Sequence, residues 1–445
     1  MMLGVVLVSA VSCLENVEKE TSPQAAITSF VVGYYNVMFH DIDWHGRDTI
    51  VAYVEGANMF PMTVDQINNR IYNIDSLSYG SVVSAVTATV NSIGTAFFRY
   101  TDDPDSMVTV WSRTDTINFT RPLVFSVLST DGTYFRDYTV QLNVRKVFPD
   151  SLLWSRRDSA GFTAMDRPAA AILGDTLYNF GIDGNGVLSV SARSILEGEW
   201  SAPSALSTIT SDLWSGNVFA FNGRLYTHSG TSVYESSDGK AWNEVKSGVR
   251  YLVKSGSDNG FVWAVSQDGM IIRTSDMSEW VVVGAVPEGF PDSAAVSLDY
   301  PLPTNTSISR SILVGPGADS LYASVWAILS TDSVMMEIDA PAKESLRLPV
   351  MDGLSVIRYD GHLFAFGNGL EGFRQSNDNG ITWYWCDSYA DDYSSWNRYM
   401  QFPSELRGYE GGFSYAVDRF NSIWIMTSDG QVWRGAITRL DKRGK

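Results

Sequence analysis

The sequence predicts an all-β protein in which an N-terminal β-sandwich precedes a six-bladed β-propeller. Two patterns support this fold class. Short runs of alternating apolar and polar residues fill the first third of the chain, and a longer unit ending in Ser/Thr-x-Asp and a Trp recurs along the rest. The composition agrees, because 13% aromatic residues and 37 glycines suit many short strands joined by tight turns.

Size and charge narrow the classes of function. The 445 residues are enough for two to four domains at about 100–200 residues each. A hydrophobic content of 44% excludes wholesale disorder. The net charge of −18 argues against nucleic acid and anionic lipid headgroups as partners.

The first residues predict an export signal and a lipid anchor. Residues 1–12 form an apolar run that ends in small residues directly before Cys13, and the run is shorter than the about 20 residues that span a bilayer. This arrangement resembles a bacterial lipobox, which implies that the mature chain begins at an acylated Cys13. It departs from a signal peptide in having no Lys or Arg ahead of the run, and a clipped core strand is the alternative.

The next segment is polar and acidic, and we interpret residues 13–25 as a tether between lipid and fold. Cys386 is the only other cysteine. With Cys13 lipidated, a disulfide scaffold and a cysteine-based zinc site are both excluded.

Residues 26–147 predict the sandwich. About eight short strands in some 120 residues, separated by Gly, Asp, Asn and Pro clusters, are typical of this fold. The expected strands are Ala26–Val32, Thr49–Val54, Arg70–Ile74, Val82–Val90, Ala96–Tyr100, Met107–Trp111, Leu123–Leu128 and Tyr134–Val144.

The sandwich also carries a family resemblance. FPMTVDQINNRIYNIDSLSYG (Phe60–Gly80) and FSVLSTDGTYFRDYTVQLNV (Phe125–Val144) resemble the immunoglobulin-like module of lipoproteins from Bacteroides-type gut anaerobes. In that family the module precedes a propeller with Asp boxes of the sialidase or kelch-like kind. The resemblance implies a domain order and supplies no activity.

Residues 150–445 predict the propeller. The second strands of six repeats begin 37 to 60 residues apart, near Leu177, Leu225, Val262, Ile312, Leu363 and Ile423. Four-stranded blades take about 40–50 residues. The last copy has only three strands, and residues 151–157 would supply its missing outer strand and so hide the open sheet edges. An open solenoid and a second sandwich are the alternative folds. A seventh blade is the alternative to six, because the stretch Val281–Ser311 is irregular.

Three turns resemble Asp boxes. Ser376–Trp383 matches S-x-D-x-G-x-T-W, and Ser236–Trp242 and Thr274–Trp280 are shortened versions. In such a turn the carboxylate accepts backbone N–H bonds, Gly permits a positive φ and the Trp packs between blades. In sialidase-like and glycosidase-associated propellers the box lies away from the substrate, which implies a structural role for Asp238, Trp242, Asp276, Trp280, Asp378, Gly380 and Trp383. The Arg-Ile-Pro opening of sialidases is absent, so we do not predict sialidase activity.

A ligand site is expected where outer strands connect to the next inner strands. Two such connections are long, Val282–Ser311 and Tyr384–Tyr415. The second combines aromatic faces, which stack on sugar rings, with carboxylates that accept hydroxyl hydrogens. The predicted ligand-binding residues are Trp385, Tyr389, Asp391, Asp392, Tyr393 and Trp396. The alternative is a lid that buries its own aromatic side chains on the propeller rim.

No motif assigns a catalytic residue, a metal or a cofactor. His40 and His45 in HDIDWHGRD fit a surface loop, and G-x-S-x-G, H-E-x-x-H and P-loop signatures are missing. We therefore predict a monomeric outer-membrane lipoprotein, on the cell surface or the periplasmic side, that binds a glycan or an envelope protein and is not an enzyme. A hydrolase or lyase with carboxylates in the propeller funnel, and a structural subunit of an outer-membrane complex, are the alternatives.

Overall fold

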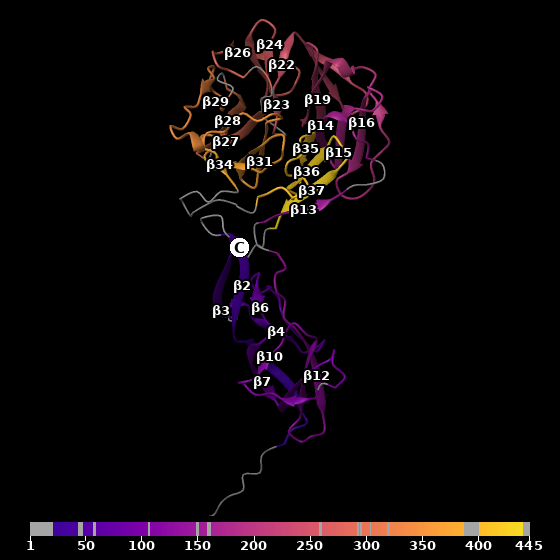
Figure 1. Cartoon of the computed structure of the whole chain (residues 1–445), viewed down its shortest axis with the longest axis vertical. Helices are drawn as coiled ribbons and strands as arrows, with labels where there is room; N and C mark the ends of the chain where they lie inside the picture. Colours follow the sequence, from indigo (N-terminus) through magenta and orange to yellow (C-terminus); the bar gives the residue numbers. More distant parts are fainter. Residues whose placement is uncertain are drawn as a thin grey trace, which may run out of the picture. The chain divides into compact units, whose positions relative to one another are not determined.

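The computed structural model describes residues 21–42, 48–56, 59–105, 107–147, 151–157, 162–257, 260–291, 293, 296–302, 304–317, 321–386 and 400–438. These residues form β-strands joined by turns and short 3₁₀ segments, and they contain no helix that could span a membrane. Contacts divide the chain into two units at Phe148/Pro149 (Figure 1). The predicted export signal and Cys13 lie outside the described residues.

The N-terminal unit is built from three sheets. The largest has the strand order β4-β5-β12-β11-β8-β9. Its strands are β4 (Met62–Asp65), β5 (Arg70–Asn73), β12 (Phe135–Gln141), β11 (Leu123–Leu128), β8 (Thr95–Tyr100) and β9 (Thr109–Val110). The second sheet contains β1 (Ala26–Val32), β7 (Val86–Ile93) and β10 (Thr116–Ile117). Phe30 of β1 meets Phe125 of β11 edge-on at 5.3 Å between ring centroids, so the two sheets share one core.

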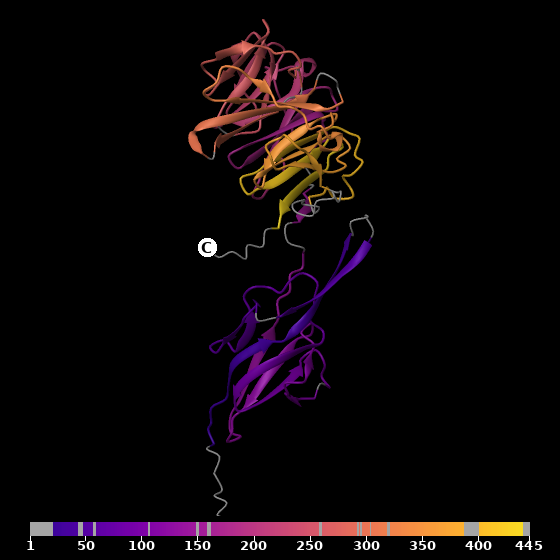
Figure 2. The same cartoon turned by 90° about the vertical axis from the view of Figure 1, so that its left-hand side faces the viewer.

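The third sheet contains a long hairpin. Strands β2 (Tyr34–Ile42) and β3 (Asp48–Gly56) pair over nine residues each, and β6 (Ser81–Val82) adds to β2. Figure 2 shows the hairpin as an extended arm of this unit. Tyr35 and Val37 are buried in the core, whereas Tyr34 and Val54 are 78% and 64% exposed. The predicted strands did not include β2, because its outward positions are apolar as well and mask the alternation.

The C-terminal unit is a propeller, which confirms the predicted all-β fold class. Six sheets succeed one another along the described chain, each starting at the propeller axis. The first blade comprises β14 (Asp166–Leu173), β15 (Thr176–Ile182), β16 (Leu188–Ser194) and β17 (Ser204–Ala205). The second comprises β18 (Trp214–Phe221), β19 (Arg224–Ser229), β20 (Ser232–Ser236) and β21 (Asn243–Ser247). The third comprises β22 (Val249–Leu252), β24 (Val262–Ser266), β25 (Met270–Thr274) and β26 (Val281–Ala285).

The last three blades include the closure of the ring. The fourth blade comprises β23 (Lys254–Ser255), β27 (Val296–Leu302), β28 (Asn305–Pro316), β29 (Ala323–Leu329) and β30 (Met336–Glu337). The fifth comprises β31 (Ser355–Tyr359), β32 (His362–Phe366), β33 (Arg374–Ser376) and β34 (Tyr384–Trp385). The sixth comprises β35 (Phe413–Val417), β36 (Ser422–Thr427), β37 (Val432–Ile437) and β13 (Leu152–Arg156). Strand β13 pairs antiparallel with β37 from Leu152↔Ile437 to Arg156↔Trp433. The first strand of this unit thus completes the last blade.

One expected connection is largely sheet. The stretch Val282–Ser311 contains most of β26, all of β27 and the first part of β28, which leaves residues 286–295 as the connection. The sequence did not predict a strand here because it contains Pro301, and proline has no N–H to donate to the hydrogen-bond ladder of a sheet. In the structure it lies beside a register shift of the β27–β28 pair.

Candidate functional site

The three Asp-box carboxylates are bonded within their own turns. The Oδ1 of Asp238 accepts the N–H groups of Lys240 and Ala241 at 2.9 and 3.0 Å. Asp276 accepts the equivalent N–H groups of Ser278 and Glu279 at 2.9 and 3.0 Å. The backbone N–H groups stabilise the charged carboxylates and so hold the pKa values of Asp238 and Asp276 below their usual value. The largest contributions come from Ala241 for Asp238 and from Glu279 for Asp276.

The third box uses the side chain of its threonine as well as the backbone. Asp378 accepts the N–H of Thr382 at 2.8 Å and its hydroxyl at 2.6 Å, and Ser376 donates to it at 2.9 Å. The indole N–H of Trp383 donates to the Gly380 carbonyl at 2.9 Å, and the ring is buried. Each box lies between the third and fourth strands of its blade, and none of the three carboxylates lines a cavity on the propeller axis.

The second box departs from the pattern. Its Met277 occupies the glycine position with φ +66°, a left-handed conformation that non-glycine residues rarely adopt. The indole Nε1 of Trp280 has no hydrogen-bond partner among the described residues, whereas Trp242 donates to Gly239 at 3.1 Å. The second box therefore keeps the hydrogen bonds of its carboxylate but lacks the hydrogen bond of its tryptophan.

The predicted sugar loop, Tyr384–Tyr415, is described over residues 384–386 and 400–415. Trp385 ends β34, and the guanidinium of Arg374 lies 5.1 Å from its ring centroid. A side chain on Gly372 would approach the same ring within 3.1 Å, so Trp385 packs on its own blade. Tyr389, Asp391, Asp392, Tyr393 and Trp396 lie outside the described residues.

A cavity of about 480 Å³ opens on the propeller axis, and we call it the funnel. Its walls are the inner strands of the blades, of which Figure 1 shows β14, β23, β31 and β35 gathered around the centre. The residues that line it come from the beginnings of these strands, where the outer-to-inner connections arrive. The funnel therefore opens on the face where the sequence predicted a ligand. The larger side chains that line the funnel are those of Asn217, His228, Tyr251, Lys254, Phe413 and Tyr415.

A narrower cavity of about 130 Å³ continues along the same strands. Ala170, Lys254 and Tyr415 line both cavities, so these residues lie where the two meet. Arg358 of β31 lines the narrow part. Together the two cavities follow the propeller axis.

The polar groups of the funnel are held in fixed positions. The Nζ of Lys254 lies 4.0 Å from the centroid of the Tyr415 ring. The Nδ2 of Asn217 donates to the Leu252 carbonyl at 2.6 Å, while its Oδ1 is buried and has no donor among the described residues. His228 Nε2 lies 3.2 Å from the Val249 carbonyl, so this nitrogen carries the proton. Burial lowers the pKa of His228 and favours the neutral ring.

No Asp or Glu lines either axial cavity among the residues that the structure describes. The enzyme hypothesis placed carboxylates in the funnel, and the described lining departs from it. The basic side chains of the lining are Lys254, His228 and Arg358.

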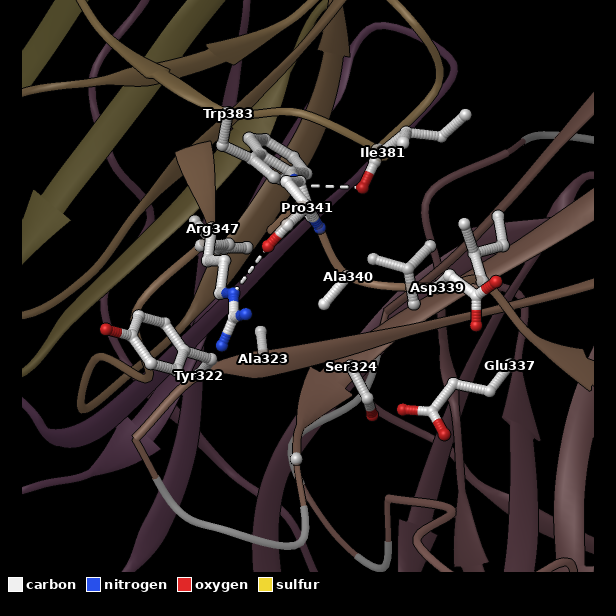
Figure 3. Close-up of a pocket in the computed structure, with 15 residues that line it drawn as sticks. Tyr322, Ala323, Ser324, Glu337, Asp339, Ala340, Pro341, Arg347, Ile381 and Trp383 are labelled. Carbon is white, nitrogen blue, oxygen red and sulfur yellow. Dashed lines mark hydrogen bonds between the residues drawn. The ribbon is translucent and has the colours of Figure 1, made fainter. Parts of the chain in front are cut away.

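A second kind of cavity lies at the rim, between the fourth and fifth blades. This rim groove of about 230 Å³ is bounded by β29, β30 and the third Asp box. Arg347 donates through Nε to the Pro341 carbonyl at 2.7 Å, and its guanidinium lies 5.3 Å from the Tyr322 ring centroid. Figure 3 shows Glu337 and Asp339 on the opposite wall. The rim groove thus presents both signs of charge.

Sequence reasoning did not identify Lys254 or Asn217. Lys254 follows the apolar residues Tyr251-Leu252-Val253, and a lysine at the end of such a run is a usable signal. Asn217 stands in Trp214–Phe221 with nothing in the local pattern to distinguish it. Only the ring topology brings these two positions to one cavity.

The comparisons with known proteins identify the family. Residues 148–443 match the model of the DUF6242 beta propeller domain. The chain belongs to this family. Residues 37–142 match the N-terminal domain of DUF6242, which is described as a domain of unknown function. No curated protein matches the chain in sequence.

This DUF6242 chain is similar to several solved structures at low sequence identity. The Hadza microbial sialidase Hz136 is 12% identical, with 93% of this chain and 95% of that chain covered and a TM-score of 0.38. AofleA from Arthrobotrys oligospora is 13% identical, with 64% and 90% covered and a TM-score of 0.37. The GH93 alpha-L-arabinofuranosidase of Fusarium graminearum is 12% identical, with 66% and 99% covered and a TM-score of 0.35.

Proposed function

We propose that this protein is a lipid-anchored binding protein of the bacterial cell envelope and that its propeller funnel receives a glycan. The observation that carries the proposal is the axial cavity of about 480 Å³, within the range of about 300–1,000 Å³ typical of small-ligand sites. It combines apolar ring faces with a few fixed polar groups. That combination suits a sugar, whose C–H faces stack on aromatic rings while its hydroxyls form hydrogen bonds.

The funnel supplies both halves of this recognition. Tyr251, Phe413 and Tyr415 contribute aromatic surface, and each is half-buried. His228 and Lys254 contribute polar groups, which are positioned by the Val249 carbonyl and by the Tyr415 ring. A rigid site loses little entropy when it binds, which favours affinity.

The second candidate function is turnover of the same glycan. Hydrolysis by two carboxylates needs an acid and a base about 5–9.5 Å apart, and the described lining offers neither. A lyase remains the form that the lining favours, because a neutral His228 and a cationic Lys254 line one cavity. Release of an unsaturated product from a bound uronic-acid glycan would establish this second candidate.

The binding proposal is tested by a glycan array followed by calorimetry on the purified protein. We expect a glycan hit whose affinity falls at least tenfold in Tyr251→Ala, since an aromatic face is lost from the funnel. Tyr322→Ala in the rim groove is the matched control and should bind as the wild type does. No hit across host, plant and bacterial glycans would overturn the glycan proposal, and a hit lost only in Tyr322→Ala would move the site to the rim.

The lipid anchor rests on the residues before Cys13 and is tested separately. Cells that express the protein with an alkyne-labelled palmitate should label the wild type and Cys386→Ala but not Cys13→Ala. Cys386 is the matched control because it is the other cysteine and is buried. Equal labelling of Cys13→Ala and the wild type would refute lipidation at Cys13.

A further inference from the structure

The charge of the axial cavities is opposite to that of the whole chain. The chain carries 50 acidic and 32 basic residues, yet the charged residues that line the two cavities in the described part are Lys254 and Arg358. A low-dielectric cleft lined by one sign of charge concentrates its field on a ligand of the opposite sign. The rim groove has Glu337 and Asp339 on the wall opposite Arg347 (Figure 3) and so lacks this bias.

Lys254 is built into the sheet at this point. Strand β23 runs parallel to β27 through the pairs Lys254↔Val296 and Ser255↔Ser297, and Gly256 donates to the Ser297 carbonyl at 2.7 Å. On the other side, the Val253 N–H donates to the Trp263 carbonyl at 2.9 Å. The backbone is therefore fixed on both flanks of the lysine.

The ammonium group is positioned and lacks a described counter-ion. It lies 4.0 Å from the Tyr415 ring centroid, and no carboxylate of the described residues comes within ion-pair distance of it. A half-buried charge that is not neutralised is costly to the fold. A ligand anion would neutralise it.

The aromatic wall of the same cavity specifies more than a bare anion. Tyr251, Phe413 and Tyr415 line the funnel together with Lys254, and each is half-buried. A ligand with an acid group and apolar ring faces satisfies Lys254 and the aromatic wall together.

We propose that the funnel selects acidic saccharides, carboxylated or sulfated, and that Lys254 binds their acid group. This inference rests on the proposed glycan-binding function and adds the chemical class of the ligand. It assigns Lys254 as the residue that determines specificity.

The first test uses sulfate alone and needs no knowledge of the ligand. The protein is acetylated with an N-hydroxysuccinimide ester, and labelling at each lysine is followed by mass spectrometry with sulfate or with chloride at equal ionic strength. We expect sulfate to slow the labelling of Lys254 at least threefold more than that of the exposed Lys240 and Lys343. Equal effects at all three lysines would overturn the inference.

The second test compares matched saccharides by calorimetry. Trigalacturonate is paired with its methyl ester, and 3′-sialyllactose with lactose, on the wild type, Lys254→Met and Lys254→Arg. We expect an acidic member to bind at least tenfold more tightly than its neutral partner, Lys254→Met to remove that preference and Lys254→Arg to retain it. A neutral member that binds as tightly as its acidic partner, or an undiminished preference in Lys254→Met, would overturn the inference.

The outcomes separate the two claims. Equal binding of acidic and neutral saccharides in the funnel would leave the glycan-binding function standing and remove its acid specificity. Protection of Lys254 by sulfate without binding of any saccharide would support the anion site and refute the glycan-binding function.

Discussion

Single residues in this propeller show how a motif can resemble a catalytic group and be structural. Asp378 accepts three hydrogen bonds from Ser376 and Thr382 inside its own turn, and these bonds occupy its oxygens. The carboxylate therefore stabilises the turn and is not available to a substrate. The residues that face the funnel carry no recognisable motif.

Replacing Asp378 should affect stability and leave binding intact. We expect Asp378→Ala to lower the free energy of unfolding by about 2 kcal/mol, because the Thr382 N–H and hydroxyl lose their acceptor. Urea unfolding followed by tryptophan fluorescence measures the change, with the exposed Asp339→Ala as control. An unchanged stability, or a loss of glycan affinity at equal stability, would contradict the structural role.

Asp299 predicts a pH dependence of stability. Burial raises its pKa to about 6, with partial compensation from the Ser311 hydroxyl, the Phe261 N–H and Arg273. The folded state therefore binds this proton more tightly than the unfolded state does, and stability falls as pH rises from about 4 to about 6. The loss approaches about 3 kcal/mol at most, from about 1.4 kcal/mol per pKa unit.

The check is the difference between the wild type and Asp299→Asn. Unfolding free energies measured from pH 4 to pH 8 should show that the wild type loses more stability than the variant as pH rises through 4–6. Parallel curves for the two proteins would show that Asp299 has no raised pKa in the folded state.

At the scale of elements, the closure of the ring depends on close packing between β13 and β37. Trp154 donates its indole N–H to the Gln401 carbonyl at 2.7 Å and lies against Gly435 of the paired strand. A Cβ atom on Gly435 would come within 2.8 Å of the Trp154 ring. The glycine is therefore required by its neighbour.

A single methyl group should test this contact. We expect Gly435→Ala to destabilise the protein by about 1–3 kcal/mol through overpacking. Gly184→Ala is the matched control, because a Cβ there meets nothing within 4 Å. Equal unfolding midpoints for the two variants in urea would refute the packing of Trp154 on β37.

The elements were predictable where their pattern was simple. Five of the six expected second strands begin within one residue of the predicted positions. The sixth position, Ile312, lies inside β28, which begins at Asn305 and is the third strand of its sheet. Strand β2 and the β26–β28 region escaped prediction, since two-sided apolar character and Pro301 mask the alternation of buried and exposed positions. Of the candidate sugar-binding residues, Trp385 packs on its own blade, and the funnel residues come together only through closure of the ring.

For the whole molecule, the described residues form separate cores in the two units. The cluster around Phe30, Phe125 and Tyr138 lies entirely in the N-terminal unit, and the other clusters lie in the propeller. We expect calorimetry to resolve two unfolding transitions, of which Phe125→Ala lowers one and Trp383→Ala the other. A single transition shifted by both variants would show that the units unfold together.

The central claim is that the funnel of the propeller holds the ligand, and the structure of the complex tests it most directly. The protein would be crystallised with the saccharide that binds most tightly in the array. We expect electron density for the saccharide in the funnel, with its acid group at Lys254 Nζ. Density in the rim groove at Arg347, or on residues 385–396 with none in the funnel, would contradict the claim.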